Sequence, residues 1–316
     1  MAEWLFEAGI GENRAALVGQ DTILEARVDR NHDTVRFGAI LPARLRRKAG
    51  PSGRGEVELE GGVSALLAPL PPGLPEGATL LVEVVREAIP ERGNPKLPLV
   101  RPADTAEPRP APSLIDVLQA TGIPVRRLRA HEPDALEAAG WSELIEQAET
   151  GLVPFPGGLL RIALTPAMTV IDVDGELPAA ELAVRGASAA GAAIRQFGIT
   201  GSIGIDLPSV PSKQARQTAA EALDRALPPP FERTAVNGFG FMQIVRRRMR
   251  ASLPELVQSD PVAASALALL RRAEREPAGL SRILGPPPVL DRIRAEPGWI
   301  AELCSRRGEL IEVGPA

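Results

Sequence analysis

The sequence predicts a mixed α/β protein, with a small β-barrel in its first half and an α/β core after it. Between residues 15 and 86, short alternating runs are separated by Gly and Pro turns, which is typical of a small barrel or sandwich. From Gly157 onward, apolar strand-like runs alternate with Ala-rich segments of helical pattern. At roughly 150 residues per domain, the 316 residues suffice for about two domains.

The first strands are expected at residues 15–18 and 23–28, because Gly19-Gln20-Asp21 between them suits a hairpin turn. The other short runs of this half are candidate barrel strands, at 36–41, 56–60, 64–68 and 80–86. Residues 102–112 are rich in proline and polar side chains, which is typical of a linker or a surface crossing.

The second half is expected to begin with helices and to continue as an α/β unit. A hairpin is predicted where two apolar runs, 159–164 and 168–173, are joined by Thr165-Pro166-Ala167. Ser212 is a suitable N-cap for the helix that follows the strand expected at 201–207. The predicted helices are 114–120, 135–150, 179–197, 212–227, 241–250 and 261–276, and further strands are predicted at 231–237 and 309–313.

Charge and composition exclude several classes of protein. The chain has 36 basic and 40 acidic residues, a net charge of −4, which excludes a uniformly basic nucleic-acid coat but not a local basic groove. A single Cys, Cys304, excludes a disulfide framework and a thiolate zinc cage within one chain, and the two His, His32 and His131, are too far apart in the sequence to predict a histidine-rich metal site. The apolar runs are shorter than the roughly 20 residues of a membrane helix, and the start lacks the basic residues of a signal peptide. We therefore expect a cytoplasmic protein that does not enter a membrane.

Two aspartates end apolar strands. Asp172 closes Thr169-Val170-Ile171, and Asp206 closes Ile203-Gly204-Ile205. An acid there is costly to bury without a partner, and ligands of open α/β sheets gather at the carboxyl ends of strands. We expect Asp172 and Asp206 to bind one Mg²⁺, or Mn²⁺, and Asp174 to be an auxiliary ligand on the same face. The alternative is that each acid caps the helix or turn that follows it.

A cluster of arginines follows in the second half. Arg246 and Arg250 are four residues apart, so on a helix they share a face that can neutralise phosphates. Phe239 precedes the cluster and is a candidate for stacking on a base. The alternatives are a solvated helix face for the arginines and a core position for Phe239.

The order of these pieces resembles the ribonuclease E/G family. Residues 152–158, Leu-Val-Pro-Phe-Pro-Gly-Gly, and 164–175, which end in Ile-Asp-Val-Asp-Gly, are similar to the family's LPSGG turn and IDVN motif. Residues 194–206 are similar to its ARQ and IDFIDM stretch, and residues 239–248 to its RFGLLEMSRQR block. The resemblance is clear over residues 151–256 and fainter over residues 14–101.

The resemblance implies an RNase H-like core that carries Asp172 and Asp206, a small inserted oligonucleotide-binding (OB-type) barrel and a C-terminal α/β extension. It also implies Mg²⁺-dependent endonucleolytic cleavage of single-stranded RNA to 5′-phosphate and 3′-hydroxyl ends, in RNA processing or decay. The expected RNA contacts are Arg246, Arg248, Phe239 and Lys213. The expected parts are first strands of the core (1–35), barrel (36–101), linker with a helical segment (102–150), nuclease core (151–256) and extension (257–316).

Several positions differ from the family pattern. Asp174 stands where the family has Asn, Gly186 falls near another Asn, and Gln243 replaces a Glu. The motif that senses a 5′-monophosphate, the cysteine zinc link and the long Arg-rich tail have no counterpart, so no zinc-linked dimer is expected. These differences keep two alternatives open: a non-catalytic RNA-binding relative, and an α/β scaffold whose partner is another protein.

Overall fold

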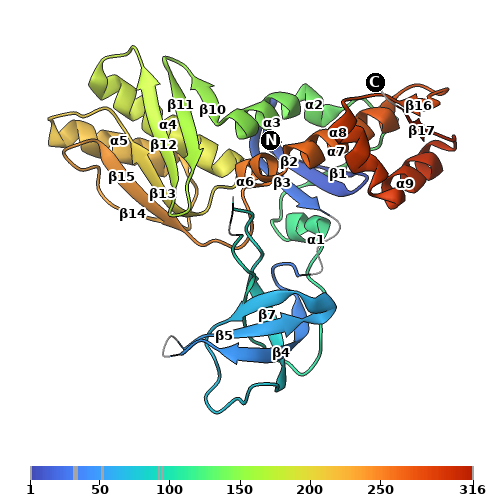
Figure 1. Cartoon of the computed structure of the whole chain (residues 1–316). Helices are drawn as coiled ribbons and strands as arrows, with labels where there is room; N and C mark the ends of the chain where they lie inside the picture. Colours follow the sequence, from blue (N-terminus) through green and yellow to red (C-terminus); the bar gives the residue numbers. More distant parts are fainter. Residues whose placement is uncertain (1, 31–34, 51–52, 92, 94, 315–316) are drawn as a thin grey trace.

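The computed structural model describes residues 2–30, 35–50, 53–91, 93 and 95–314. Figure 1 shows a β-barrel that stands apart from the rest of the chain and is joined to it by extended segments. The rest consists of a small N-terminal sheet, a larger α/β unit and a C-terminal group of helices. The mixed α/β class and the barrel expected from the sequence are confirmed.

The first strands form a sheet of their own. β1 (Glu3–Ala8), β2 (Glu12–Gly19) and β3 (Thr22–Arg30) are antiparallel, and β9 (Val125–Arg127) joins β1 in parallel. The β2–β3 turn holds Gln20 and Asp21 at positive φ, as a two-residue hairpin requires. These strands do not extend the sheet that carries Asp172 and Asp206, in contrast to the arrangement expected from the sequence. Instead, their apolar side chains pack in the same hydrophobic cluster as the side chains beneath that sheet.

Five strands close into the barrel: β4 (Ile40–Lys48), β5 (Gly55–Leu59), β6 (Ser64–Leu67), β7 (Thr79–Arg86) and β8 (Leu99–Pro102). The order around it is β4-β5-β6-β8-β7, and β7 pairs back with β4. Only the β6–β8 pair is parallel among these described strands. Alternation along the strands directs Leu45, Val57 and Val82 into a fully buried interior. A 3-10 helix, η2 (Glu60–Gly62), joins β5 to β6.

Three short helices connect the barrel to the α/β unit. α1 (Leu114–Gln119) begins after Ser113, whose hydroxyl accepts a hydrogen bond from the Asp116 amide. The helix expected over 135–150 is interrupted at Gly140, which has a φ of 94°, and forms α2 (Ala135–Ala138) and α3 (Trp141–Thr150). This positive φ is accessible to glycine and ends a regular helix.

The α/β unit is built on a six-stranded sheet. In spatial order its strands are β10 (Leu152–Phe155), β11 (Gly158–Leu164), β12 (Thr169–Gly175), β13 (Gly201–Asp206), β15 (Phe241–Arg246) and β14 (Glu232–Arg233). β12 and β13 are parallel, whereas the other neighbours are antiparallel. α4 (Ala179–Gln196) connects β12 to β13, and α5 (Lys213–Ala226) follows β13.

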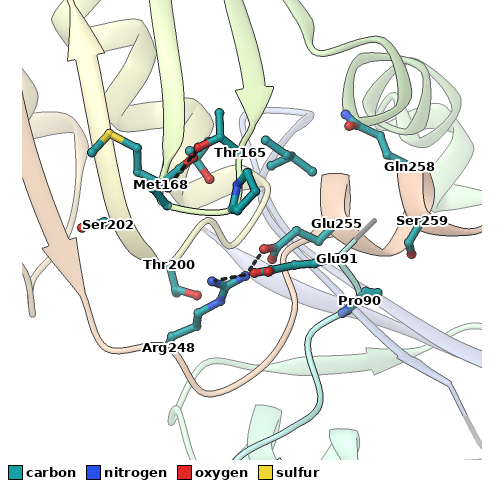
Figure 2. Close-up of a pocket in the computed structure, with 14 residues that line it drawn as sticks. Pro90, Glu91, Thr165, Met168, Thr200, Ser202, Arg248, Glu255, Gln258 and Ser259 are labelled. Atoms are coloured by element: carbon teal, nitrogen blue, oxygen red, sulfur yellow. Dashed lines mark hydrogen bonds and ion pairs between the residues drawn. The ribbon is translucent and has the colours of Figure 1, made fainter. Parts of the chain in front are cut away.

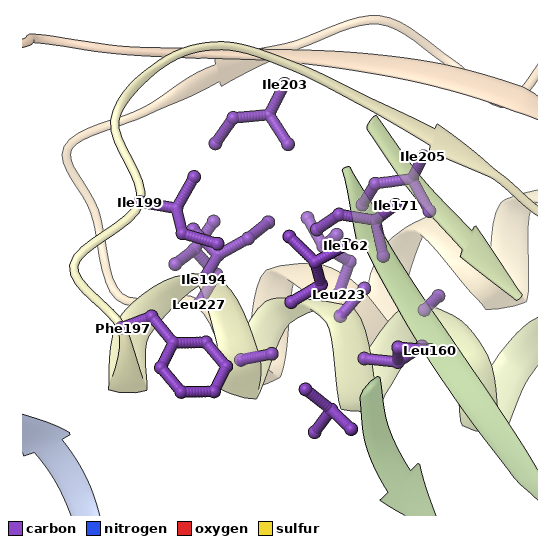
Figure 3. Packing of buried hydrophobic residues seen from close by; sticks show 14 of the residues in the cluster. Leu160, Ile162, Ile171, Ile194, Phe197, Ile199, Ile203, Ile205, Leu223 and Leu227 are labelled. Atoms are coloured by element: carbon purple, nitrogen blue, oxygen red, sulfur yellow. The ribbon is translucent and has the colours of Figure 1, made fainter. Parts of the chain in front are cut away.

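α4 and α5 cover one face of this sheet, and their contact with it is the main hydrophobic core. Figure 3 shows Ile171 and Ile205 of the sheet packed beside Leu223 of α5. Gly186 lies where α4 touches β12, because a Cβ there would be 2.3 Å from Val173 Cγ1. The departure from the family pattern at Gly186 therefore lies in the core, where an asparagine side chain has no room.

Residues 241–250 do not form the predicted helix. Phe241–Arg246 is β15, in which Met242 and Ile244 are buried against the helices while the intervening side chains face the other way. This two-residue alternation pairs β15 with β13 and buries its apolar positions, so sheet packing determines the conformation. The preceding strand, expected over 231–237, is reduced to β14.

The C-terminal residues form a separate group of helices around their own hydrophobic cluster. α6 (Leu253–Ser259) packs in the main core through Leu253 and Val257. The C-terminal group consists of α7 (Pro261–Arg275), β16 (Arg282–Ile283), α8 (Pro287–Arg294), α9 (Pro297–Arg307) and β17 (Glu312–Val313). The cluster includes Ile10 from the turn between β1 and β2, so this group is anchored to the N-terminal sheet. No helix in the described part of the chain is long and apolar enough to cross a membrane.

Candidate active site

Asp172 and Asp206 lie side by side at the end of the six-stranded sheet. They are register partners on the parallel strands β12 and β13, so their side chains project from the same face. The preceding partners, Ile171 and Ile205, face the opposite way and are fully buried beneath the helices. Both aspartates are therefore on the face that the helices leave free. We call this place the Asp172–Asp206 edge.

Residues of the two neighbouring strands, β11 and β15, lie beside the two aspartates. Arg161 of β11 is the register partner of Asp172, and Phe241 of β15 is the register partner of Asp206. Arg161 donates from Nε to Asp174 Oδ2 at 2.6 Å, and both side chains are about half exposed. The edge thus combines three carboxylates, one guanidinium and an aromatic ring.

The carboxylates of Asp172 and Asp206 are available for a ligand. Within the described residues, neither forms a hydrogen bond or an ion pair. No group of three or more His, Cys, Asp or Glu side chains in this part of the chain is placed to hold a metal ion, and the carboxylate of Asp174 binds Arg161 instead. A pair of free carboxylates still fits Mg²⁺, which binds through one or two carboxylates, keeps several waters and takes further oxygens from substrate phosphates.

Phe239 is held in solvent at the same end of the sheet. Its side chain is 84 % exposed, so it is not a core residue. The turn is fixed by Asn237, whose Oδ1 accepts hydrogen bonds from the amides of Phe239 and Phe241 at 2.9 and 3.1 Å. An exposed aromatic ring held by a fixed turn is suited to stacking on a base.

Lys213 is the first residue of α5, which begins seven residues after Asp206 at the carboxyl end of β13. Ser212 caps the helix by accepting a hydrogen bond from the Ala215 amide, and Lys213 is exposed. The helix N-terminus and the Lys213 ammonium both contribute positive charge at this end of the sheet.

The structure does not bring Arg246 and Arg248 to this edge. Arg246 is at the opposite end of β15 from Phe241, about 17 Å away at roughly 3.4 Å per residue. Its Nη1 donates to the Ile199 carbonyl at 3.0 Å, and burial lowers the pKa of its guanidinium. The expected helical face shared by Arg246 and Arg250 is absent because Arg246 ends a strand.

Arg248 is tied to other parts of the chain. Its guanidinium forms ion pairs with Glu255 of α6 and, at 3.8 Å, with Glu91 from the connection between barrel strands β7 and β8 (Figure 2). It lines a cavity of about 230 Å³ beside the turn that joins β11 to β12. This turn is at the amino end of β12, so the cavity is separate from the Asp172–Asp206 edge.

Two residues of the edge, Arg161 and Asn237, are not predicted as site residues from the sequence. Arg161 is the exposed position in the alternating run Leu160-Arg161-Ile162, and this alternation was the available signal. Asn237 precedes two glycines in Asn237-Gly238-Phe239-Gly240, a composition that indicates a turn. Neither pattern shows that these residues lie beside the aspartates, because that depends on strand pairing.

No protein-family model and no curated protein matches this chain. The geometry of the Asp172–Asp206 edge and the short motifs that resemble the ribonuclease E/G family are therefore the features that bear on function.

Proposed function

We propose that the protein is a cytoplasmic, Mg²⁺-dependent endoribonuclease that cleaves single-stranded RNA to 5′-phosphate and 3′-hydroxyl ends. The observation that carries the proposal is the register pairing of Asp172 with Asp206 on adjacent parallel strands, with both carboxylates free of partners in the described residues. The motif resemblance supplies the substrate class and the reaction.

Each residue of the edge has a role in this proposal. Asp172 and Asp206 supply the oxygens that hold Mg²⁺ or Mn²⁺. The bound ion would lower the pKa of a water molecule and stabilise negative charge on the phosphodiester. Phe239 stacks on a base and orients the strand, while Lys213 and Arg161 attract phosphates. Asp174 keeps Arg161 directed along the edge.

The barrel is proposed to be the RNA-binding module of OB type. Five strands in the order β4-β5-β6-β8-β7, with β6 and β8 parallel, resemble the barrels that bind oligonucleotides. Residues 36–101 contain ten basic and seven acidic residues, a local charge of +3 in a chain whose net charge is −4. This local positive charge favours the attraction of RNA phosphates to the barrel, and the affinity for RNA should fall with salt.

The RNase H-like core also belongs to the proposal. β11, β12, α4 and β13 form an antiparallel pair followed by a parallel strand–helix–strand unit, which supports a core of this kind. Because the N-terminal strands pair with β9 instead of with this unit, the proposed core consists of residues 151–256 without the first strands.

The test is cleavage of a fluorescent, A/U-rich single-stranded RNA by the full chain, with Mg²⁺ or with EDTA. We expect Mg²⁺-dependent cutting that falls by about 100-fold or more in Asp206→Asn, since second-shell partners alone are worth 10–100-fold at metal sites. Asp291→Asn is the matched control, because Asp291 is exposed on α8 and pairs only locally with Arg294. Equal cleavage by wild type and Asp206→Asn would refute the assignment.

A second readout separates the metal site from catalysis. Mn²⁺ or Mg²⁺ should raise the thermal midpoint of the wild type and not that of Asp172→Asn, because an ion that binds only the folded state stabilises it. RNA binding without cleavage or metal stabilisation would favour the non-catalytic RNA-binding relative, for which the ion pair that occupies Asp174 is the supporting observation. Absence of RNA binding as well would favour the scaffold.

A further inference from the structure

A cavity at the opposite end of the α/β unit has an excess of positive charge. It has a volume of about 440 Å³ and lies between β3, the end of α4, the segment after β15 and α1. Four arginines line it, Arg27, Arg195, Arg246 and Arg250, together with a single carboxylate, that of Glu25. We call it the four-arginine cavity.

Glu25 cannot neutralise these groups. Its Oε1 accepts hydrogen bonds from Arg27 Nε at 2.9 Å and Nη2 at 2.7 Å, while its Oε2 is 3.8 Å from Arg195 Nε. The Nε of Arg195 is buried and makes no hydrogen bond. Arg246 binds only the carbonyl of Ile199 among the described residues, and burial lowers the pKa of its guanidinium. The Glu25 carboxylate is thus shared by the guanidiniums of Arg27 and Arg195. The guanidinium of Arg246 has only a neutral partner among the described residues.

A second arginine-rich cavity shows the contrast. It has a volume of about 410 Å³ and lies between the N-terminal sheet, α3 and α7. Its guanidiniums pair with carboxylates: Arg14 and Arg275 bind Glu7 and Asp134, while Arg271 and Arg30 both pair with Glu12. In that cavity the arginines and carboxylates form an internal structural network. In the four-arginine cavity, positive charge that no carboxylate neutralises is available to a ligand.

The excess of guanidinium groups in the four-arginine cavity favours a phosphate as its ligand. Guanidiniums bind phosphate through paired, charge-assisted hydrogen bonds, and a dianion relieves the mutual repulsion of like charges. Phe37 lines the same cavity, and the guanidinium of Arg247 lies 5.9 Å from the centre of its ring. An aromatic wall next to arginines provides an apolar surface for a base. The volume is within the range of pockets for small organic ligands.

We propose that the four-arginine cavity binds a nucleoside monophosphate, with the phosphate held by Arg195 and Arg246 and the base placed against Phe37. Arg246 is at the far end of β15 from the Asp172–Asp206 edge, so this site is distinct from the proposed catalytic site. The proposal does not depend on the protein being a nuclease.

Isothermal titration calorimetry of the full chain tests the proposal with three probes at matched ionic strength: adenosine 5′-monophosphate, inorganic phosphate and adenosine. We expect binding of the first two and none of adenosine. The double variant Arg195→Gln, Arg246→Gln should weaken the binding of adenosine 5′-monophosphate by at least about tenfold, because two charge-assisted hydrogen-bonding groups are removed. The matched control, Arg126→Gln with Arg272→Gln, removes the same charge from two exposed positions outside the cavity and should leave the affinity unchanged.

Two single variants keep the test independent of folding in the double variant. Glu25→Gln removes the competing carboxylate and should tighten phosphate binding, a change that damage to the fold does not produce. Phe37→Ala should weaken adenosine 5′-monophosphate binding and leave that of inorganic phosphate unchanged. Asp206→Asn should not affect either probe. The proposal is overturned if neither phosphate compound binds at millimolar concentration, if the double variant and its control behave alike, or if Glu25→Gln weakens binding.

Discussion

Arg161 reaches diagonally across the sheet to Asp174 and not straight across to Asp172. Arg161 and Asp172 are register partners, yet the guanidinium Nε is 2.6 Å from Asp174 Oδ2, one position further along the same face of β12. Diagonal neighbours on a sheet are within reach of long side chains. The ion pair leaves the carboxylate of Asp172 free beside that of Asp206 and neutralises the third acid of the edge.

This arrangement predicts unequal roles for the three aspartates. Asp174→Asn should lower Mg²⁺-dependent cleavage by less than about tenfold, because an exposed ion pair contributes little and its loss leaves the Asp172–Asp206 pair intact. Asp172→Asn should lower it by about 100-fold or more. Single-turnover cleavage rates for the two variants, measured side by side, provide the comparison. An equally large loss in both would make Asp174 a ligand.

Phe239→Ala should weaken binding of single-stranded RNA without affecting stability. Stacking on one base is worth about 1–3 kcal/mol, so the Kd should rise by roughly 5- to 150-fold. The side chain is 84 % exposed, so its removal leaves no cavity. Fluorescence anisotropy with a labelled RNA measures the effect, and Leu310→Ala, at a 91 % exposed position in the C-terminal group, is the control. Equal affinities of the two variants would exclude stacking on Phe239.

Gly240→Ala should destabilise the turn that holds Phe239. Gly240 has a φ of 94°, and a Cβ there would be 2.0 Å from the Leu207 carbonyl oxygen. We expect a loss of at least about 2 kcal/mol in the free energy of unfolding, since a positive φ alone costs of order 1–3 kcal/mol in a non-glycine residue. Gly238→Ala is the matched control in urea unfolding, because a Cβ at Gly238 meets nothing within 4 Å. Similar midpoints for the two variants would contradict the geometry.

The buried network around Arg14 predicts how stability depends on pH. Arg14 binds Glu7 and, through Nη2 at 2.8 Å, Asp134, and it stacks on Trp141. Burial by itself would raise the pKa of Glu7, but Arg14 and Arg275 outweigh it and lower that pKa below 4.5. The pKa of Asp134 is lowered below 3.8 by the same opposing effects. Because the folded-state pKa values are depressed, this stabilisation is present above about pH 4.5 and is lost as the pH falls through them.

Arg14→Met should cost about 3–5 kcal/mol at pH 7, because it leaves buried carboxylates without a partner. It should also flatten the loss of stability below pH 4.5, since fewer carboxylates then have depressed pKa values. Urea unfolding at pH 7 and pH 4 measures both effects. Arg126→Met removes an exposed pair with Glu3 and should change stability by less than about 1 kcal/mol. A cost for Arg14→Met as small as that of this control would show that the network does not stabilise the fold.

The sequence predicted the elements in which local pattern and packing agree. The hairpin of β2 and β3, the barrel strands and α5 with Ser212 as its cap follow from alternation, turn residues and capping preferences. It failed at residues 241–250, where a run of arginines suggested an exposed helix. There the two-residue alternation of Met242 and Ile244 determines the strand conformation, because pairing with β13 buries those side chains.

The sequence by itself determined that Asp172 and Asp206 would each end an apolar strand, because a carboxylate is excluded from the buried part of a sheet. Only the tertiary structure decided that they are register partners, that Arg161 forms an ion pair with Asp174, and that Arg246 lines a different cavity together with Arg195. These relations join residues far apart in the chain. Their strand register is set by which side chains the sheet buries against α4 and α5, and no local pattern encodes that choice.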